Sequence, residues 1–385
     1  MTAYNTTDLD NRLIQQQASE AFRTSCIGEE SLARILKAHP DKLYTPNYFI
    51  RLALGVLTFV AVLFITFLFV LFFGTNNDGA LITLLLLMGI ACYVALELMI
   101  KSKKYYNAGV DNTLMISCII LIISALFISG DSSYILISAV TTILSLWLCL
   151  RFTDAFMASV FYLAFFIFAF LLYVKLGAIA KATAPLLMMA ASAIVYFILK
   201  KIEKNERIAH YLFAIDTVKF LTLVSFYASA NYFVVKEVSD QMFGLHLSVH
   251  HGIFLGWLFW ILTVIIPPLY VLYGIFKKDF LFIRTGMGLI AATIFTIRYY
   301  HAILPTEIAM LIAGLLLISI SYFLIKYLST TRNGYTFQNL HPADKNLLNA
   351  EALIIAQTFG TGRKVESNTL YGGGSGAGGG ATGDF

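Results

Sequence analysis

Two residues of opposite charge interrupt an apolar stretch in the second half of the chain, "RIAHYLFAIDTVKFLTLVSFYASANYF". Asp216 and Lys219 are three residues apart, so on an α-helix they lie on nearly the same face and can form an ion pair. At bilayer depth each charge costs about 2.5 to 3.5 kcal/mol unless it has a partner, a water-filled cavity or a function. The pair therefore predicts either a site for an ion, proton or polar solute, or a self-neutralised pair that pins this helix to a neighbour.

A second group of reactive types lies in "RYYHAILPTE", residues 298–307. Arg298 and His301 are three residues apart, close enough to share an anionic group or to pair with Glu307. The other residues suit a turn between two membrane helices, because tyrosines favour the interface and Pro305 fits the first turn of a helix. The residues of this stretch that remain candidates for binding or catalysis are therefore Arg298, His301 and Glu307.

A third charged residue, Glu97, lies near the end of an apolar stretch, four residues before Lys101. A glutamate followed by a lysine at this spacing forms a favourable pair on a helix. We expect this pair at the membrane interface, and Glu97 joins the candidate residues of a substrate or ion path: Asp216, Lys219, Arg298, His301, Glu307 and Glu97.

The elements that position these residues are membrane helices. Hydrophobic residues make up 59% of the 385-residue chain, charged residues only 13%, and the mean hydropathy is +0.78. A soluble domain would have about a quarter of its residues charged. Apolar windows of about 17 to 25 residues, each long enough to cross the hydrocarbon core as a helix, recur along the chain. We predict an all-α, polytopic integral membrane protein with about ten transmembrane helices.

The ten predicted spans are roughly 52–73, 79–100, 113–129, 133–150, 155–174, 182–199, 208–234, 252–275, 281–297 and 307–328. The third, fourth, sixth and ninth are short enough to leave a re-entrant segment open as an alternative. In the eighth span, Pro267 and Pro268 remove two amide donors, so a kink or break is expected there.

The basic residues predict the orientation. With the N-terminus inside, nearly all of the 27 lysines and arginines fall in inside segments. Only Lys175, Lys181, Lys236 and Arg298 fall outside, and Lys219 lies within a span. Since cytoplasmic loops are enriched in these residues, both termini are predicted to be cytoplasmic. We expect a multi-pass protein of the bacterial inner membrane.

Four regions follow from this layout. Residues 1–49 predict a cytoplasmic amphipathic helical hairpin, and residues 50–328 the transmembrane bundle. Residues 329–370 form a cytoplasmic segment with one amphipathic helix, and the glycine-rich residues 371–385 are expected to be a disordered tail. The lipid bilayer is the expected partner, a protein partner at the hairpin or the tail is an alternative, and no nucleic acid is expected.

Several motifs of known chemistry are missing. The sequence has no glycine-rich nucleotide loop, zincin helix or Gly-x-Ser-x-Gly elbow, so ATP-driven transport is not expected. The four cysteines share no motif spacing. We expect no cofactor, no metal site and no catalytic residue, and a role without enzymatic activity is favoured.

The layout resembles a family of uncharacterised bacterial polytopic inner-membrane proteins. The resemblance rests on the N-terminal hairpin, about ten spans, "YYNAGVDN" after the second span and "TIRYYHAILPTE" before the last. It implies the inner membrane and no particular activity, so no functional residue is transferred.

Three functions are compatible with these residues. The first is a transporter or permeation protein for a small molecule or ion, with Asp216 and Lys219 on its path. The second is a non-catalytic scaffold or partner subunit. The third is a membrane-embedded enzyme that modifies lipids, using Arg298 and His301 on a head group.

Overall fold

The computed structural model describes residues 2–23, 26–73, 78–130, 133–243 and 255–300, and scattered positions from 311 to 326. Within these ranges the chain is almost wholly helical, as predicted from its composition. The predicted tenth span, 307–328, lies outside the continuously described residues. The predicted cytoplasmic segment 329–370 and the glycine-rich tail 371–385 lie outside the described residues altogether.

Nine helices in the described ranges are long and apolar enough to cross a membrane. They confirm a multi-pass, all-α membrane protein. The four spans expected to be short are 19, 19, 25 and 21 residues long as helices α5, α6, α8 and α12. The bounds, in chain order, are α1 (Thr6–Arg23), α2 (Glu29–Ala38), α3 (Tyr48–Phe73), α4 (Asp78–Lys103), α5 (Val110–Ile128), α6 (Tyr134–Phe152), α7 (Ala155–Val174), α8 (Ala178–Ile202), η1 (Glu206–Tyr211), α9 (Leu212–Ala230), α10 (Tyr232–Phe243), α11 (Gly256–Lys277) and α12 (Phe280–Tyr300).

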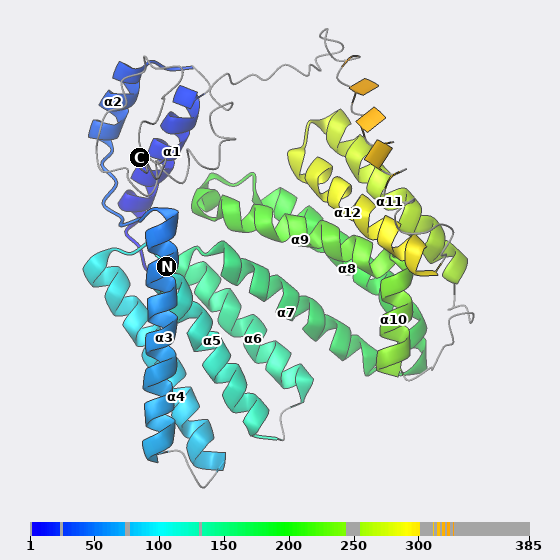
Figure 1. Ribbon diagram of the computed structural model, residues 1–385, viewed down its shortest axis with the longest axis horizontal. Coiled ribbons are helices and arrows are strands. Elements are labelled where there is room, and N and C mark those ends of the chain that lie inside the picture. The colour runs from blue at the N-terminus through cyan, green and yellow to red at the C-terminus, as the bar shows by residue number, and fades with distance from the viewer. Residues whose placement is uncertain are drawn as a thin grey trace, which may run out of the picture.

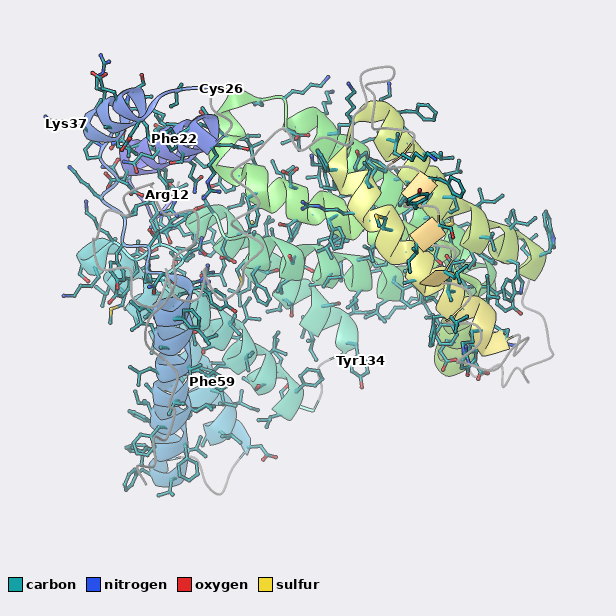
Figure 2. The ribbon with its side chains drawn as sticks, turned by 45° about the horizontal axis from the view of Figure 1, so that its top comes forward. Arg12, Phe22, Cys26, Lys37, Phe59 and Tyr134 are labelled. Atoms are coloured by element: carbon teal, nitrogen blue, oxygen red, sulfur yellow. The ribbon has the colours of Figure 1, made fainter. Side chains whose placement is uncertain are left out.

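The long helices pack mostly with their neighbours in the chain, as the pairs α4 with α5, α6 with α7, α8 with α9 and α11 with α12. Figure 1 shows them fanning out from α3, so that α8 and α9 are strongly inclined to it. Helix α3 lies at the edge of the fan and buries none of its residues (Figure 2). Its apolar side chains are therefore left for lipid.

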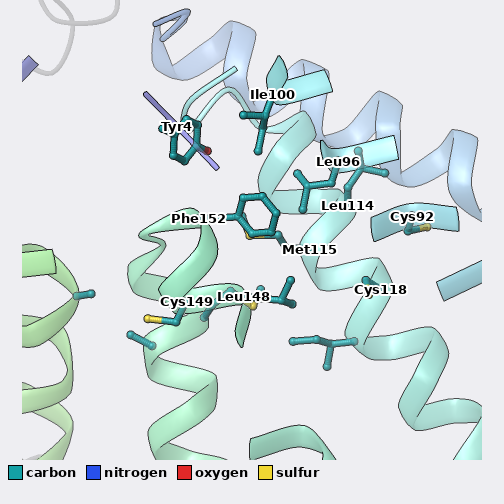
Figure 3. Packing of buried hydrophobic residues seen from close by; sticks show 14 of the residues in the cluster. Tyr4, Cys92, Leu96, Ile100, Leu114, Met115, Cys118, Leu148, Cys149 and Phe152 are labelled. Carbon is teal, nitrogen blue, oxygen red and sulfur yellow. The ribbon is translucent and has the colours of Figure 1, made fainter. Parts of the chain in front are cut away.

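The main core lies between α4, α5, α6, α7 and α9. Leu96, Met115, Leu148 and Phe152 are almost fully buried in it. Figure 3 shows Tyr4, from the N-terminal segment, at the same end of this cluster as Ile100 and Phe152. The N-terminus thus contributes an aromatic side chain to the core of the membrane bundle.

The helices α1 and α2 lie at one end of the bundle, which we call the hairpin end (Figure 1). Asp8, which is buried, accepts a hydrogen bond from Lys104 at 3.3 Å, and Arg12 lies 4.5 Å from the ring centre of Tyr106. The amide of Ala3 donates to the carbonyl of Arg151 at 2.8 Å. These contacts dock the N-terminal segment on the α4–α5 loop and on the end of α6.

The seventh predicted span is not one helix, which corrects the expectation of a continuous helix over 208–234. It begins as the short 3₁₀ helix η1, continues as α9 and breaks at Asn231, where α10 starts. The break is stabilised because the first three amides of α10 find acceptors. The Asn231 Oδ1 atom accepts from Phe233 and Val234, and the hydroxyl of Thr263 accepts from Tyr232 at 2.9 Å.

The eighth predicted span keeps a continuous helix through its prolines, so the expected break is wrong in α11. Pro267 has no amide hydrogen to donate to the carbonyl of Thr263, four residues earlier. That carbonyl instead accepts a hydrogen bond of 3.1 Å from the hydroxyl of Thr293 on α12. The neighbouring helix therefore supplies the donor that proline removes, which is how prolines are tolerated in membrane helices.

Helices α11 and α12 pack closely against each other at Gly286. A Cβ atom built there would lie 2.9 Å from the backbone nitrogen of Val271 and 3.1 Å from the carbonyl oxygen of Pro267. A methyl group at Gly288, two residues further along the same helix, would meet no atom within 4 Å. The two glycines therefore form a matched pair for testing this packing.

We expect Gly286→Ala to lower the free energy of unfolding by about 1 to 3 kcal/mol, because backbone atoms cannot move aside as a side chain can. Gly288→Ala should leave stability unchanged or raise it slightly, since alanine favours a helix. Thermal unfolding of the purified variants in detergent measures both. Equal melting temperatures for the two variants would contradict the close contact.

Candidate functional site

A pocket of about 840 Å³ opens between the end of α8, the first half of α9 and the turn that joins α11 to α12. It contains both residues of the predicted membrane ion pair, Asp216 and Lys219. Helix α9 starts at the hairpin end, because His210 in η1 lies 3.2 Å from Asp10 of α1. The pocket therefore opens toward the hairpin end of the bundle.

Lys219 is the most deeply placed charge in the pocket, with only 11% of its side chain exposed. Its ammonium group lies 2.8 Å from Asp216, which confirms the predicted pair, and 2.9 Å from Glu203 at the end of α8. Side chains on a helix point toward its N-terminus, so Lys219 reaches back toward the hairpin end. There it joins α9 to α8 through Glu203, while Asp216 pairs with it within α9.

Glu203 is the residue of this site that the sequence analysis missed. It lies sixteen residues before Lys219, and helical spacing does not relate positions in two different helices. The available signal was a carboxylate among the basic residues of "KKIEKNE", at the end of a span that is followed by the charged seventh span. An acid there, next to a span with a buried lysine, is a candidate counter-ion.

The pocket is richer in cations than in anions. Five basic side chains and three carboxylates line it: Lys200, Lys219, Lys277, Lys278, Arg284, Glu203, Asp216 and Asp279. The Asp279 carboxylate accepts from the amide of Leu281 and thus caps the start of α12. Because five basic side chains outnumber three carboxylates, the lining has a net positive charge, which gives the pocket a positive potential.

A group of hydroxyls lies farther along α9 than the pocket. Ser225, one and a half turns beyond Lys219 on α9, is hydrogen-bonded to Tyr162 of α7 and lies 3.2 Å from the hydroxyl of Ser192 on α8. All three are buried. Small residues surround these positions in "TAPLLMMAASA" on α8 and "SFYASA" on α9, where Ala184 and Ala230 are almost fully buried, and small side chains let helices approach closely.

A second polar group lies farther along α9, where α9, α11 and α12 meet. The Asn231 amide donates to the hydroxyls of Tyr227 and Thr296 at 2.9 and 3.0 Å, and Tyr227 lies 2.8 Å from Thr293. These side chains are buried and hydrogen-bonded to one another. The polar side chains at the break in the seventh span therefore find their hydrogen-bond partners inside the protein.

Glu97 belongs to a separate cluster on α4 and α6, away from the pocket lining. The predicted contact with Lys101 is present at 3.4 Å. The shorter contact, missed from the sequence, is with Arg151, whose Nε atom donates to Glu97 at 2.9 Å. Tyr93 also donates to Glu97, and Trp147 donates to Tyr93. With three partners, Lys101, Arg151 and Tyr93, this carboxylate joins α4 to α6, and the structure does not bring it together with Asp216.

Arg298 lies in the last turn of α12, at the end of the bundle away from the hairpin. His301 and Glu307, its predicted companions, lie outside the described residues. The neighbouring Tyr300 packs against Tyr232 at 5.1 Å, and Lys236, which is buried, lies 5.1 Å from its ring centre. Aromatic side chains therefore close this part of the bundle.

Comparison with known proteins adds no function to these observations. No protein-family model, no curated protein and no solved structure matches the chain.

The pairing of Lys219 can be tested by removing its partners. Each of Glu203→Gln and Asp216→Asn should cost little, since the other carboxylate still pairs with the lysine. The double variant should lose more stability than the sum of the two, about 3 to 5 kcal/mol in total, because it leaves a buried cation without a counter-ion.

Adding Lys219→Met to the double variant removes that cation and should recover most of the lost stability. Thermal unfolding of these four variants and of the unsubstituted protein in one detergent gives the comparison. Additive single effects, or no recovery in the triple variant, would contradict the shared pairing of Lys219 by both carboxylates.

Proposed function

We propose that this chain is a transport-type protein of the bacterial inner membrane that carries a small molecule or ion. Both termini are cytoplasmic in this proposal, and the pocket that contains Lys219 is its solute site, open to the cytoplasm. The orientation is supported by the basic residues at the hairpin end, such as Lys104, Arg151 and Lys200, since cytoplasmic ends of membrane helices are rich in lysine and arginine.

One observation carries the proposal. Lys219 lies midway along the membrane-crossing segment Ile208–Ala230, is buried, and yet borders a pocket of about 840 Å³. Ionisable residues within membrane segments are costly, and they mark substrate and ion pathways more often than other positions do. A lysine that only pinned two helices would not require an open, polar pocket next to it.

The polar groups beyond the pocket support a path along α9. The junction of Tyr162, Ser192 and Ser225 comes first, and the group around Asn231 follows. In this proposal the aromatic cluster around Tyr300 closes the opposite end, so the described conformation is open to one side only.

Bridged by two carboxylates, Lys219 has a direct role in such a cycle. An incoming anion would compete with Glu203 and Asp216 for the ammonium group. Because 36% of Glu203 and 53% of Asp216 are exposed, either side chain can leave the lysine and be hydrated. Exchange of partners at Lys219 would loosen the contact between α8 and α9, and this loosening is the movement that a transport cycle requires.

The proposal is tested by the accessibility of the pocket from both sides of the membrane. Of the described cysteines, Cys26 is exposed and the other three are buried, so Cys26→Ser gives a background of low reactivity. In that background Thr217→Cys adds a thiol to the pocket. A membrane-impermeant maleimide is then applied to vesicles of either orientation.

We expect Thr217→Cys to react rapidly from the hairpin side and more slowly from the opposite side, as the site alternates between them. Lys37→Cys on the exposed surface of α2 is the control and should react from the hairpin side alone. If Thr217→Cys behaves like Lys37→Cys under every condition, the pocket has a single opening and a scaffold role takes the place of transport.

A further inference from the structure

We infer that the pocket recognises a phosphate ester, with Arg284 as its principal recognition residue. The inference rests on the proposed function, because it names the ligand class of the same pocket. Charges on separate elements line this pocket, and apolar side chains lie beside them.

Some of the charged side chains that line the pocket already have a hydrogen-bond or ion-pair partner. Lys219 is bridged by Glu203 and Asp216, and Asp279 caps α12. Among the described residues, neither Lys277 nor Arg284 has a carboxylate within ion-pair distance, and both are exposed to the pocket side of the α11–α12 turn. Cations without counter-ions beside a water-accessible pocket attract an anion.

The cations of the pocket lie on different helices. Lys277 is in the last turn of α11, Arg284 is four residues after the start of α12, and Lys200 is near the end of α8. The cations therefore lie on two sides of one pocket. A guanidinium group presents a planar pair of donors that matches two oxygens of a phosphate, and lysines add point charges. This combination suits a group with several oxygens and more than one negative charge.

The size of the pocket and its aromatic side chains indicate that the ligand has an organic part. A volume of about 840 Å³ exceeds what a bare inorganic anion fills, and it is in the range of small-molecule sites. Phe220 and Phe280 line the same pocket with 43% and 73% of their surface exposed. The ligand is therefore an ester whose phosphate meets the cations and whose organic part contacts the two phenylalanines. A soluble phosphate ester and a phospholipid head group share this chemistry.

The experiment uses the full-length protein in nanodiscs and has two arms. In one arm, glycerol 3-phosphate is titrated into protein in nanodiscs of phosphatidylcholine, and binding is measured by calorimetry. In the other arm, the nanodiscs contain both phosphatidylglycerol and phosphatidylcholine, and native mass spectrometry counts the phosphatidylglycerol retained. Binding in the first arm identifies a soluble ester, and retention in the second identifies a lipid head group. Either result supports the inference.

Arg284→Gln is the test variant and Lys201→Gln is its control. Both residues are exposed, both substitutions remove one positive charge at the hairpin end, and Lys201 does not line the pocket. We expect Arg284→Gln to weaken binding about tenfold or more, as for a lost charge-assisted hydrogen bond, and Lys201→Gln to leave it nearly unchanged. Arg284→Lys should recover only part of the loss, since it keeps the charge without the planar donor pair.

Equal weakening by Arg284→Gln and Lys201→Gln would overturn the inference, because general surface charge would then explain the binding. Absence of binding in both arms would overturn it as well. The outcome is separable from that of the cysteine experiment. Two-sided labelling without phosphate binding retains transport and rejects this ligand class, whereas specific binding with one-sided labelling retains the site and rejects transport.

Discussion

The structure depends on one constraint, which is that a polar group in hydrocarbon must find its partner inside the protein. The seventh and eighth spans show how the chain meets it. Where α9 breaks, Asn231 and Thr263 accept the freed amides of α10, and where Pro267 lacks an amide, Thr293 donates in its place. Two threonines and one asparagine thus hold α9, α10, α11 and α12 in a fixed arrangement. The same constraint places Lys219 between two carboxylates.

The two parts of the bundle meet this constraint in different ways. Around α4, α5 and α6 the interior is a hydrophobic cluster, and charged groups such as Glu97 and Arg151 pair near the hairpin end. Around α8, α9, α11 and α12 the buried contacts include many hydroxyls, and the space between the helices opens into a charged pocket. The first part has the character of a rigid support, whereas the second contains the groups able to exchange partners. This difference is why the proposed site lies in the second part.

The N-terminal segment links the two parts. It contributes Tyr4 to the hydrophobic cluster, pairs Asp8 with Lys104, and reaches η1 through the contact between Asp10 and His210. Because η1 leads directly into α9, the hairpin contacts the short helix that precedes the one containing Lys219.

The sequence by itself determined the features that depend on local spacing. Runs of apolar residues located the nine described spans, and the i,i+3 and i,i+4 spacings identified the contacts of Asp216 with Lys219 and of Glu97 with Lys101. A helix fixes the relative positions of its own residues, so these contacts follow from residue order alone. Only the tertiary structure decided which helices lie side by side. That choice added Glu203 to Lys219 and Arg151 to Glu97, moved the break from Pro267 to Asn231, and brought Arg284 to the pocket. Each of these joins residues on different helices or depends on a neighbouring helix for its hydrogen bonds, so their relation is set by packing and cannot be read from spacing along the chain.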